Sequence, residues 1–352
     1  MSRFWSDLTH SLQPYVPGEQ PSMTNLVKLN TNENPFPPSP KALAAMVAET
    51  GDNLRLYPDP TCTALRQTLA DYVGLSKEQV FVGNGSDEVL AHAFQALLKQ
   101  DEPLLFPDIT YGFYPVYGDL FGIDYRAVPL ADDLTISVAD YAGNNGGVIL
   151  PNPNAPTGCL LTLPQVRELL QANPNRVVVI DEAYIDFGGE SAVALVPEFD
   201  NLLVVQTLSK SRSLAGLRVG MAFGQAPLIA GLERVKNSFN PYPLSREALA
   251  GAIAAVADVD YFDMTRHTIM ARREQLSQQL AELGFSMTDS KANFVFVEHP
   301  SLRAADIALA LRQRGVIVRH LDSHPRTVNR LRISIGTQAE CEALVLALKE
   351  IV

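Results

Sequence analysis

Short apolar runs alternate with helical stretches through the middle of the chain, and they predict strands that are buried on both faces. The runs are rich in valine, isoleucine and leucine, and they lack the alternation of apolar and polar residues that marks a half-exposed strand. Such runs are typical of a mostly parallel sheet that is covered by helices on both sides. The predicted strands span residues 80–82, 104–106, 148–150, 177–180, 202–205 and 219–223.

The two ends of the chain follow different patterns. Residues 1–40 are rich in proline and weakly periodic, which predicts an extended arm rather than a helix or a central strand. A helix is expected over 40–49, with Pro40 near its first turn. After about residue 250 a long helical stretch, 261–283, precedes short strands at 294–297, 316–318 and 331–335, a helix that reaches Arg314, and a final helix that begins at the capping box Thr337–Glu340.

The expected fold class is therefore α/β, with a large domain built on a mostly parallel central sheet flanked by helices and a smaller α+β domain. At 352 residues the chain is long for one compact core, which also favours two domains. We place the arm at 1–40, the large domain at 41–250 and the small domain at 251–352.

Composition narrows the class of partner. The chain has 39 acidic and 28 basic residues and a formal charge of −11, which argues against nucleic acid or an anionic membrane as the main partner. We expect no signal peptide and no segment that spans a bilayer. Cys62, Cys159 and Cys341 form neither a metal-type pair nor a disulfide framework, so we expect no metal and a reducing, cytoplasmic location.

Lys210 is a candidate for covalent chemistry. A lysine after a strand is usually a solvated surface group. Here an apolar strand precedes it, Thr207 and Ser209 flank it, and Arg218 follows. Hydroxyls and an arginine suit a phosphate, and a desolvated amine close to cations forms imines readily.

Asp181 directly follows a predicted buried strand. An aspartate there is often only a helix N-cap. It can also pair with the ring nitrogen of pyridoxal 5′-phosphate (PLP), a cofactor that withdraws electrons well only while that nitrogen stays protonated. Tyr184, three residues later, is placed to reach the ring's phenolic oxygen.

Two further turns follow predicted strands. Gly83–Glu88 opens a helix and offers free backbone N–H groups to a phosphate, although glycine turns before helices are ordinary. Asn152–Gly158 is either a rigid turn or a source of an amide for a cofactor ring. Tyr111 is either a ring-stacking residue or a packed aromatic. All of these motifs lie at strand ends, where ligands of such sheets bind.

Taken together, these residues resemble the fold-type I PLP-dependent enzymes and, within them, the histidinol-phosphate aminotransferase family. The resemblance runs over nearly the whole chain, and it is more specific for the superfamily than for the substrate. It rests on Asn30–Pro35, Tyr57–Asp59, Gly83–Glu88, Tyr111, Asn152–Gly158, Asp181–Tyr184, Ser209–Lys210 with Arg218, and Leu331–Ile333.

The resemblance implies roles for the cofactor site. Lys210 would hold PLP as an internal imine and then move a proton between the substrate Cα and the cofactor C4′. Asp181 would pair with the pyridine nitrogen, while Tyr184 and Asn154 would contact the ring oxygen. Tyr111 would cover the ring, and Tyr57 would reach into the neighbouring subunit's site, which implies a homodimer with shared active sites. The cofactor phosphate would be held by Gly85, Ser86, Asp87, Thr207, Ser209 and Arg218.

The resemblance also implies how substrates are held. Arg332, together with Tyr15 and Arg319, would grip the substrate phosphate and, in the second half-reaction, the carboxylates of glutamate. Asn34 is expected among the substrate-binding residues. Isolated arginines more often form surface ion pairs, but Arg332 lies inside an apolar strand. Many relatives have asparagine directly before Pro-Thr-Gly, whereas this chain has Ala155, so either Asn154 or Asn152 must supply the amide.

The expected reaction is a ping-pong transfer of an amino group between L-histidinol phosphate and 2-oxoglutarate. The alternatives are an aminotransferase for aromatic or many amino acids, a threonine-phosphate decarboxylase of the same fold, and a non-enzymatic regulator that uses this fold. The regulator would need a DNA-binding segment, which neither the first 40 residues nor the acidic balance supplies. A dehydrogenase is disfavoured because no full dinucleotide fingerprint follows a first strand.

Overall fold

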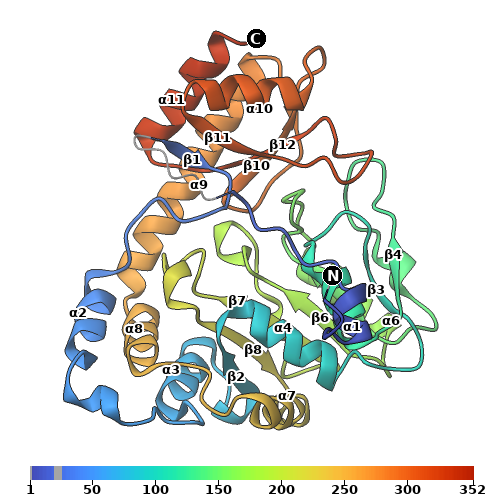
Figure 1. The fold of residues 1–352 in the computed structure, drawn as a ribbon, viewed down its shortest axis with the longest axis vertical. Helices are drawn as coiled ribbons and strands as arrows, with labels where there is room; N and C mark the ends of the chain where they lie inside the picture. The colour runs from blue at the N-terminus through green and yellow to red at the C-terminus, as the bar shows by residue number, and fades with distance from the viewer. Residues whose placement is uncertain (1, 20–25) are drawn as a thin grey trace.

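The computed structural model describes residues 2–19 and 26–352 and divides into a large lower part and a smaller upper part (Figure 1). The large part contains a seven-stranded sheet in the order β2-β8-β7-β6-β5-β3-β4. Its strands are β2 (Val80–Gly83), β3 (Leu104–Pro107), β4 (Tyr125–Val128), β5 (Val148–Pro151), β6 (Val178–Asp181), β7 (Leu202–Thr207) and β8 (Gly220–Gly224).

The neighbours from β4 through β3, β5 and β6 to β7 pair in parallel, whereas β8 runs antiparallel to both β7 and β2. The expectation of a mostly parallel sheet is therefore confirmed. All six predicted strands form within a residue or two of their expected bounds. The edge strand β4 was not predicted, because three of its four residues are exposed and it carries no apolar run.

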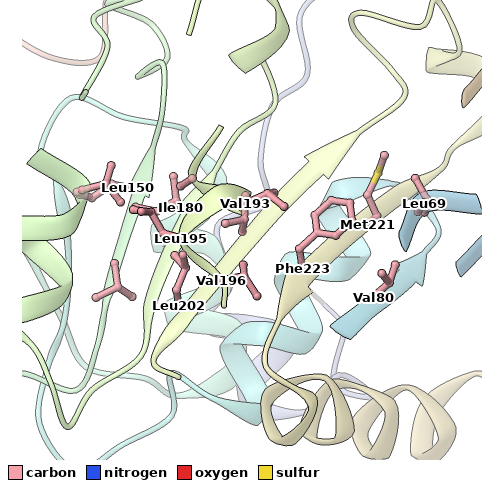
Figure 2. Packing of buried hydrophobic residues seen from close by; sticks show 14 of the residues in the cluster. Leu69, Val80, Leu150, Ile180, Val193, Leu195, Val196, Leu202, Met221 and Phe223 are labelled. Carbon is pink, nitrogen blue, oxygen red and sulfur yellow. The ribbon is translucent and has the colours of Figure 1, made fainter. Parts of the chain in front are cut away.

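Both faces of this sheet are buried, as the unalternating apolar runs predicted. On β6, Val178 and Ile180 pack into one hydrophobic cluster and Val179 into another on the opposite face. Figure 2 shows part of the first cluster, in which Leu150 and Ile180 are cross-strand neighbours on β5 and β6, and Leu202 of β7 lies below them. The first face is covered by α3 (Thr63–Val73), α6 (Leu163–Ala172) and α8 (Arg246–Ala257), and the second by α4 (Gly85–Ala96), α5 (Phe113–Phe121) and α7 (Ala226–Phe239).

The smaller part is built on a five-stranded sheet in the order β1-β11-β12-β10-β9. Its strands are β1 (Val27–Leu29), β9 (Ser286–Met287), β10 (Phe294–Glu298), β11 (Val316–His320) and β12 (Leu331–Ser334). Three helices pack on this sheet around one hydrophobic cluster: α9 (Val259–Glu282), α10 (Ala304–Gln313) and α11 (Gln338–Lys349).

The N-terminal arm is more structured than expected. Residues 20–25 of the predicted arm lie outside the described residues. Of the rest, α1 (Asp7–Ser11) is a short helix capped by Ser6, and β1 joins the small sheet as an edge strand that pairs in parallel with β11. Its Leu29 is buried in the small-domain core. The expectation of an arm without a helix was therefore wrong, because a local cap suffices to start one turn.

The predicted boundary between residues 250 and 251 falls inside α8. Buried residues of α8, such as Ala252 and Val256, pack with the large-domain core, and α8 also lies along α2 (Pro40–Glu49). Side chains of α9 join the small-domain core from Ile269 onward. Helix α9 thus leads from the end of α8 into the small-domain core, and it rises from the large part to the small part in Figure 1. Among the described helices, none combines the length and apolarity that a membrane crossing requires.

The capping box predicted at Thr337 forms. Thr337 Oγ1 accepts from Glu340 N at 3.2 Å, and Thr337 N donates to Glu340 Oε2 at 2.7 Å. The cap starts α11, whose Leu344 and Leu348 are buried in the small-domain core.

Thr337→Ala should therefore lower the free energy of unfolding by about 1 kcal/mol, since it removes one of the two cap hydrogen bonds. The matched control is Thr268→Ala, because the Thr268 hydroxyl donates only to Met264 O within α9 and alanine favours a helix. Urea denaturation of both variants checks this. A loss in Thr268→Ala as large as that in Thr337→Ala would contradict the account of the cap.

Candidate active site

Two adjoining cavities open where the carboxyl ends of the large-domain strands face the small sheet. The larger has a volume of about 320 Å³ and the smaller of about 120 Å³. Four side chains line both: Tyr111, Ala155, Tyr184 and Lys210. The smaller cavity is also lined by Ser86, Asp87, Asp181, Thr207, Ser209 and Arg218, and the larger by Tyr15, Arg319 and Arg332. The fold therefore gathers most of the predicted site residues in one place.

Asp181 ends β6 and is only 5% exposed. Its Oδ2 accepts from the Tyr114 hydroxyl at 2.9 Å, and its Oδ1 accepts from Ala183 N at 3.3 Å. Burial raises the pKa of Asp181 to about 6, against these two hydrogen bonds, which favour the anion. A buried carboxyl of this kind gains free energy from a cation placed beside it.

Lys210 follows β7 and is partly buried. Its Nζ donates to Thr31 O at 3.3 Å and lies 5.7 Å from the centre of the Tyr184 ring. The Tyr184 hydroxyl in turn accepts from Asn32 Nδ2 at 3.1 Å. The amine thus stands in the shared wall of the two cavities, where it can reach ligands in either one.

One end of the smaller cavity is rich in hydrogen-bond donors. Thr207 Oγ1 lies 2.9 Å from Ser209 Oγ and also donates to Val219 O. Ser86, in the first turn of α4, lines the same cavity. Two glycines allow this close packing. A Cβ on Gly85 would lie 2.5 Å from Arg218 Nη2, and one on Gly220 would lie 2.3 Å from Ser86 N. The arrangement of hydroxyls, helix N-terminus and guanidinium suits a phosphate group.

The side chain of Asp87, a residue expected at the phosphate site, is engaged by two other side chains. Its carboxylate accepts from the Tyr111 hydroxyl at 2.9 Å and pairs with Arg218 Nη2 at 2.9 Å. An anionic side chain would repel a phosphate, so only the backbone of Asp87 suits one. The side chain instead links the aromatic wall of the cavity to the guanidinium.

The larger cavity contains a second group of cationic side chains. Arg319 on β11 and Arg332 on β12 are cross-strand partners. Arg332 Nη2 donates to Asn30 O at 3.1 Å, while its buried Nε meets no hydrogen-bond partner within residues 2–19 and 26–352. Burial lowers the pKa of Arg332 from its usual value. Tyr15 stacks on Phe113 and lines the same cavity, so this end suits a phosphate or a carboxylate.

Four predicted residues are not among the described side chains that line either cavity. Asn154 turns its amide nitrogen inward, donating to Ile109 O and Thr157 Oγ1, and Ala155 forms the cavity wall instead. Asn34 holds the backbone of the site lysine, because its Nδ2 donates to Lys210 O at 2.9 Å. Gly85 acts through the space it leaves for Arg218. Tyr57 is 79% exposed and stacks on Tyr242.

Sequence reasoning missed two side chains that the structure brings to the site. Asn32 lies in the predicted Asn30–Pro35 motif, which was the available signal for it, and it donates to the Tyr184 hydroxyl. Tyr114 lies in the first turn of α5, three positions after Tyr111, and its hydroxyl donates to Asp181, which is 67 positions away in the sequence. Nothing in the local sequence indicated that second contact.

The residues present fit PLP, the cofactor implied by the sequence resemblance. The donor-rich end of the smaller cavity matches a phosphate, and the buried Asp181 matches a protonated ring nitrogen. Lys210 supplies an amine in the same cavity. Because Gly85 and Gly220 have no side chains, Arg218 can lie against Gly85, and the backbone of Ser86 can lie against Gly220.

Comparisons with known proteins agree with this geometry. Residues 24–348 match the family model "Aminotransferase class I and II". The chain is 59% identical to histidinol-phosphate aminotransferase 2 of Dechloromonas aromatica, over 100% of this chain and 99% of that one, and 60% identical to histidinol-phosphate aminotransferase 1 of Pseudomonas fluorescens, over 100% of both.

A similar solved structure is that of histidinol-phosphate aminotransferase from Sinorhizobium meliloti in complex with pyridoxal 5′-phosphate. It has a TM-score of 0.87 at 25% identity and covers 100% of this chain and 99% of that one. With a family model over most of its length and such relatives over all of it, the chain belongs to the class I and II aminotransferases, in the histidinol-phosphate aminotransferase family.

Proposed function

We propose that this aminotransferase moves an amino group between L-histidinol phosphate and 2-oxoglutarate, with PLP held at Lys210, by a ping-pong mechanism. One observation carries the proposal. The Lys210 amine, the buried Asp181 carboxyl and the Arg218 cradle line one small cavity, which adjoins a larger one that contains Arg319 and Arg332. Relatives named as histidinol-phosphate aminotransferases, at about 60% identity, support the choice of substrate.

PLP, when bound, supplies an aldehyde that condenses with amines and a pyridine ring that draws electrons from the bond to be broken. The chain supplies the remaining functions. Lys210 Nζ lies where both cavities meet and would act as the base that takes the proton from the substrate Cα. Two hydrogen bonds orient it: Lys210 Nζ donates to Thr31 O, and Asn34 Nδ2 donates to the backbone carbonyl of Lys210.

Asp181 would keep the ring nitrogen protonated. Its carboxylate is costly to bury alone, so a pyridinium beside it stabilises both groups. Tyr114 donates to one carboxylate oxygen, while the other accepts only a longer hydrogen bond of 3.3 Å from Ala183 N. Tyr184, fixed by Asn32, would contact the ring oxygen without help from Asn154.

Arg332, Arg319 and Tyr15 would bind the substrate anion. The buried Nε of Arg332 has no hydrogen-bond partner among the described residues. A planar guanidinium group binds a phosphate or a carboxylate through two parallel hydrogen bonds. The same group would serve the phosphate of histidinol phosphate in one half-reaction and a carboxylate of glutamate in the other. In a ping-pong mechanism the two substrates bind one after the other at the same site, so that site must accept both the phosphate and the carboxylate.

We further propose a cytoplasmic homodimer with shared active sites. Tyr57, expected to reach a neighbouring site, stacks on Tyr242 at a ring distance of 4.7 Å, and both rings are exposed. Exposed aromatic pairs are common at subunit contacts. The described cysteines are free thiols, as is usual in a reducing compartment.

The substrate panel that tests the proposal compares histidinol phosphate with phenylalanine as amino donors to 2-oxoglutarate. We expect a higher kcat/KM for histidinol phosphate, since Arg319 and Arg332 together match a dianionic phosphate. Efficient use of phenylalanine with little use of histidinol phosphate would reject the substrate and leave the cofactor assignment intact.

Lys210→Ala should lower kcat by at least roughly 100-fold, the usual contribution of a positioned base, and should remove the visible absorbance of the covalently held cofactor. Absorbance spectra and a coupled glutamate assay measure both effects. Lys291→Ala is the control, because Lys291 pairs with Asp289 at the surface. Normal turnover by the Lys210 variant would exclude Lys210 as the base.

Tyr114→Phe tests how Asp181 is held. The pKa of Asp181 is raised by burial to about 6 and restrained by the Tyr114 hydroxyl, so removing that hydroxyl raises this pKa further. Because the ionised carboxylate favours the pyridinium, affinity for PLP is present above the pKa of Asp181 and falls as pH drops through it. The fall should therefore begin at a higher pH in the variant than in the wild type.

Titration of the apo-enzyme with PLP across mildly acidic to neutral pH measures this shift. Tyr141→Phe is the matched control, because the Tyr141 hydroxyl is buried and has no hydrogen-bond partner in the described part of the chain. Protonation of the cofactor itself affects all three proteins equally. Identical pH profiles in Tyr114→Phe and the wild type would refute the role of Tyr114.

A further inference from the structure

The larger cavity has a wall that none of the roles above uses. Beside Lys210 and the two arginines it is lined by Asp108, Thr110 and His324. Asp108 and Thr110 directly follow β3 in the large domain, and His324 lies in the loop between β11 and β12 of the small domain. The cavity thus holds a pair of guanidinium groups and also a carboxylate.

Asp108 is held as a hydrogen-bond acceptor. Its Oδ1 accepts from Leu130 N at 3.0 Å, and its side chain remains 18% exposed. Its Oδ2 lies 3.5 Å from His324 Nε2. Because His324 Nδ1 accepts from Arg326 N at 3.2 Å, the ring proton of the neutral histidine is on Nε2, facing the carboxylate. Asp108 is therefore already placed to accept from an imidazole N–H.

Thr110 adds a second polar group to this wall. Its Oγ1 is buried and meets no hydrogen-bond partner among the residues that the structure describes. Buried hydroxyls are nearly always hydrogen-bonded, so an unpartnered one in a cavity wall points to a ligand. A hydroxyl both donates and accepts, which suits either nitrogen of a neutral imidazole.

We propose that Asp108, with Thr110 and His324 beside it, forms the subsite that binds the imidazole ring of histidinol phosphate, while Arg319 and Arg332 bind its phosphate. The inference rests on the proposed function and names the residue that sets its specificity. The substrate carries an anion at one end and a ring with N–H donors, partly cationic near neutral pH, at the other. Glutamate has no such ring, so Asp108 serves only one of the two half-reactions.

A purely structural role for Asp108 would be to tie the His324 loop to the large domain. Arg326 already ties that loop, because its guanidinium donates to Leu130 O at 2.8 Å and also to Ala131 O. The loop is thus anchored without the Asp108–His324 contact. Arg326 also provides the matched control for a role in anchoring.

The test measures the two half-reactions separately in the holoenzyme, with histidinol phosphate and with glutamate as amino donors. Asp108→Asn keeps an oxygen to accept from Leu130 N but loses the charge. It should lower kcat/KM for histidinol phosphate by roughly 10- to 100-fold, the usual effect of losing a charged hydrogen bond, and leave the glutamate half-reaction unchanged. The phosphate ester of 2-aminopropanol, which lacks the ring, should react equally with the variant and the wild type.

Arg326→Gln loosens the loop and should lower both half-reactions together. The proposal is overturned if Asp108→Asn behaves as the wild type, or if it loses both half-reactions in the manner of Arg326→Gln. A wild-type enzyme that reacts with glutamate but not with histidinol phosphate would overturn the proposed function and this subsite with it, a result distinct from the other two.

Discussion

The site depends on a carboxyl group that is buried at the end of a strand. Asp181 is buried at the end of β6, where Tyr114 of α5 contacts it, and burial raises its pKa to about 6. Ionising such a group costs free energy unless a cation lies next to it. In the proposed function a pyridinium cofactor would supply that cation, while the Tyr114 hydroxyl already donates to the carboxylate. The same interaction would then bind the cofactor and keep its ring electron-poor.

The parallel sheet explains why the other groups meet there. Parallel strands end at one edge, so Asp181 after β6 and Lys210 after β7 emerge side by side. The antiparallel β8 starts at the same edge and brings Arg218, just before it, to the turn that opens α4. The small domain then covers this edge with the cross-strand pair Arg319 and Arg332. Each domain thus contributes cationic groups to the site, and we propose that those of the large domain bind the cofactor and those of the small domain the substrate.

The sequence predicted those parts of the fold that local patterns determine. Unalternating apolar runs indicated the central strands, because strands buried on both faces need no polar side. The cap at Thr337 was predicted because it depends on residues three positions apart. The edge strand β4 and the pairing of β1 with β11 were not predicted, since exposed edges carry no apolar signal and strand pairing depends on distant residues.

The candidate site divides in the same way. Lys210 and Asp181 were assigned from their positions after strands, Arg218 from its place shortly after Lys210, and all three from the resemblance. Asn154 was assigned to the cofactor ring, but the direction of an amide depends on tertiary neighbours such as Ile109, which the local motif does not contain. Contacts such as Tyr114–Asp181 and Asp108–His324 join segments far apart in the chain, so only the folded structure reveals them.

We infer that the cofactor is linked to one particular amine, that of Lys210. Borohydride reduction of the holoenzyme followed by peptide mass spectrometry tests it most directly, because reduction makes the link permanent. We expect the mass of the reduced cofactor on the peptide that contains Lys210 and on no other lysine. Modification of a different lysine, such as Lys28, with Lys210 left free, would contradict it.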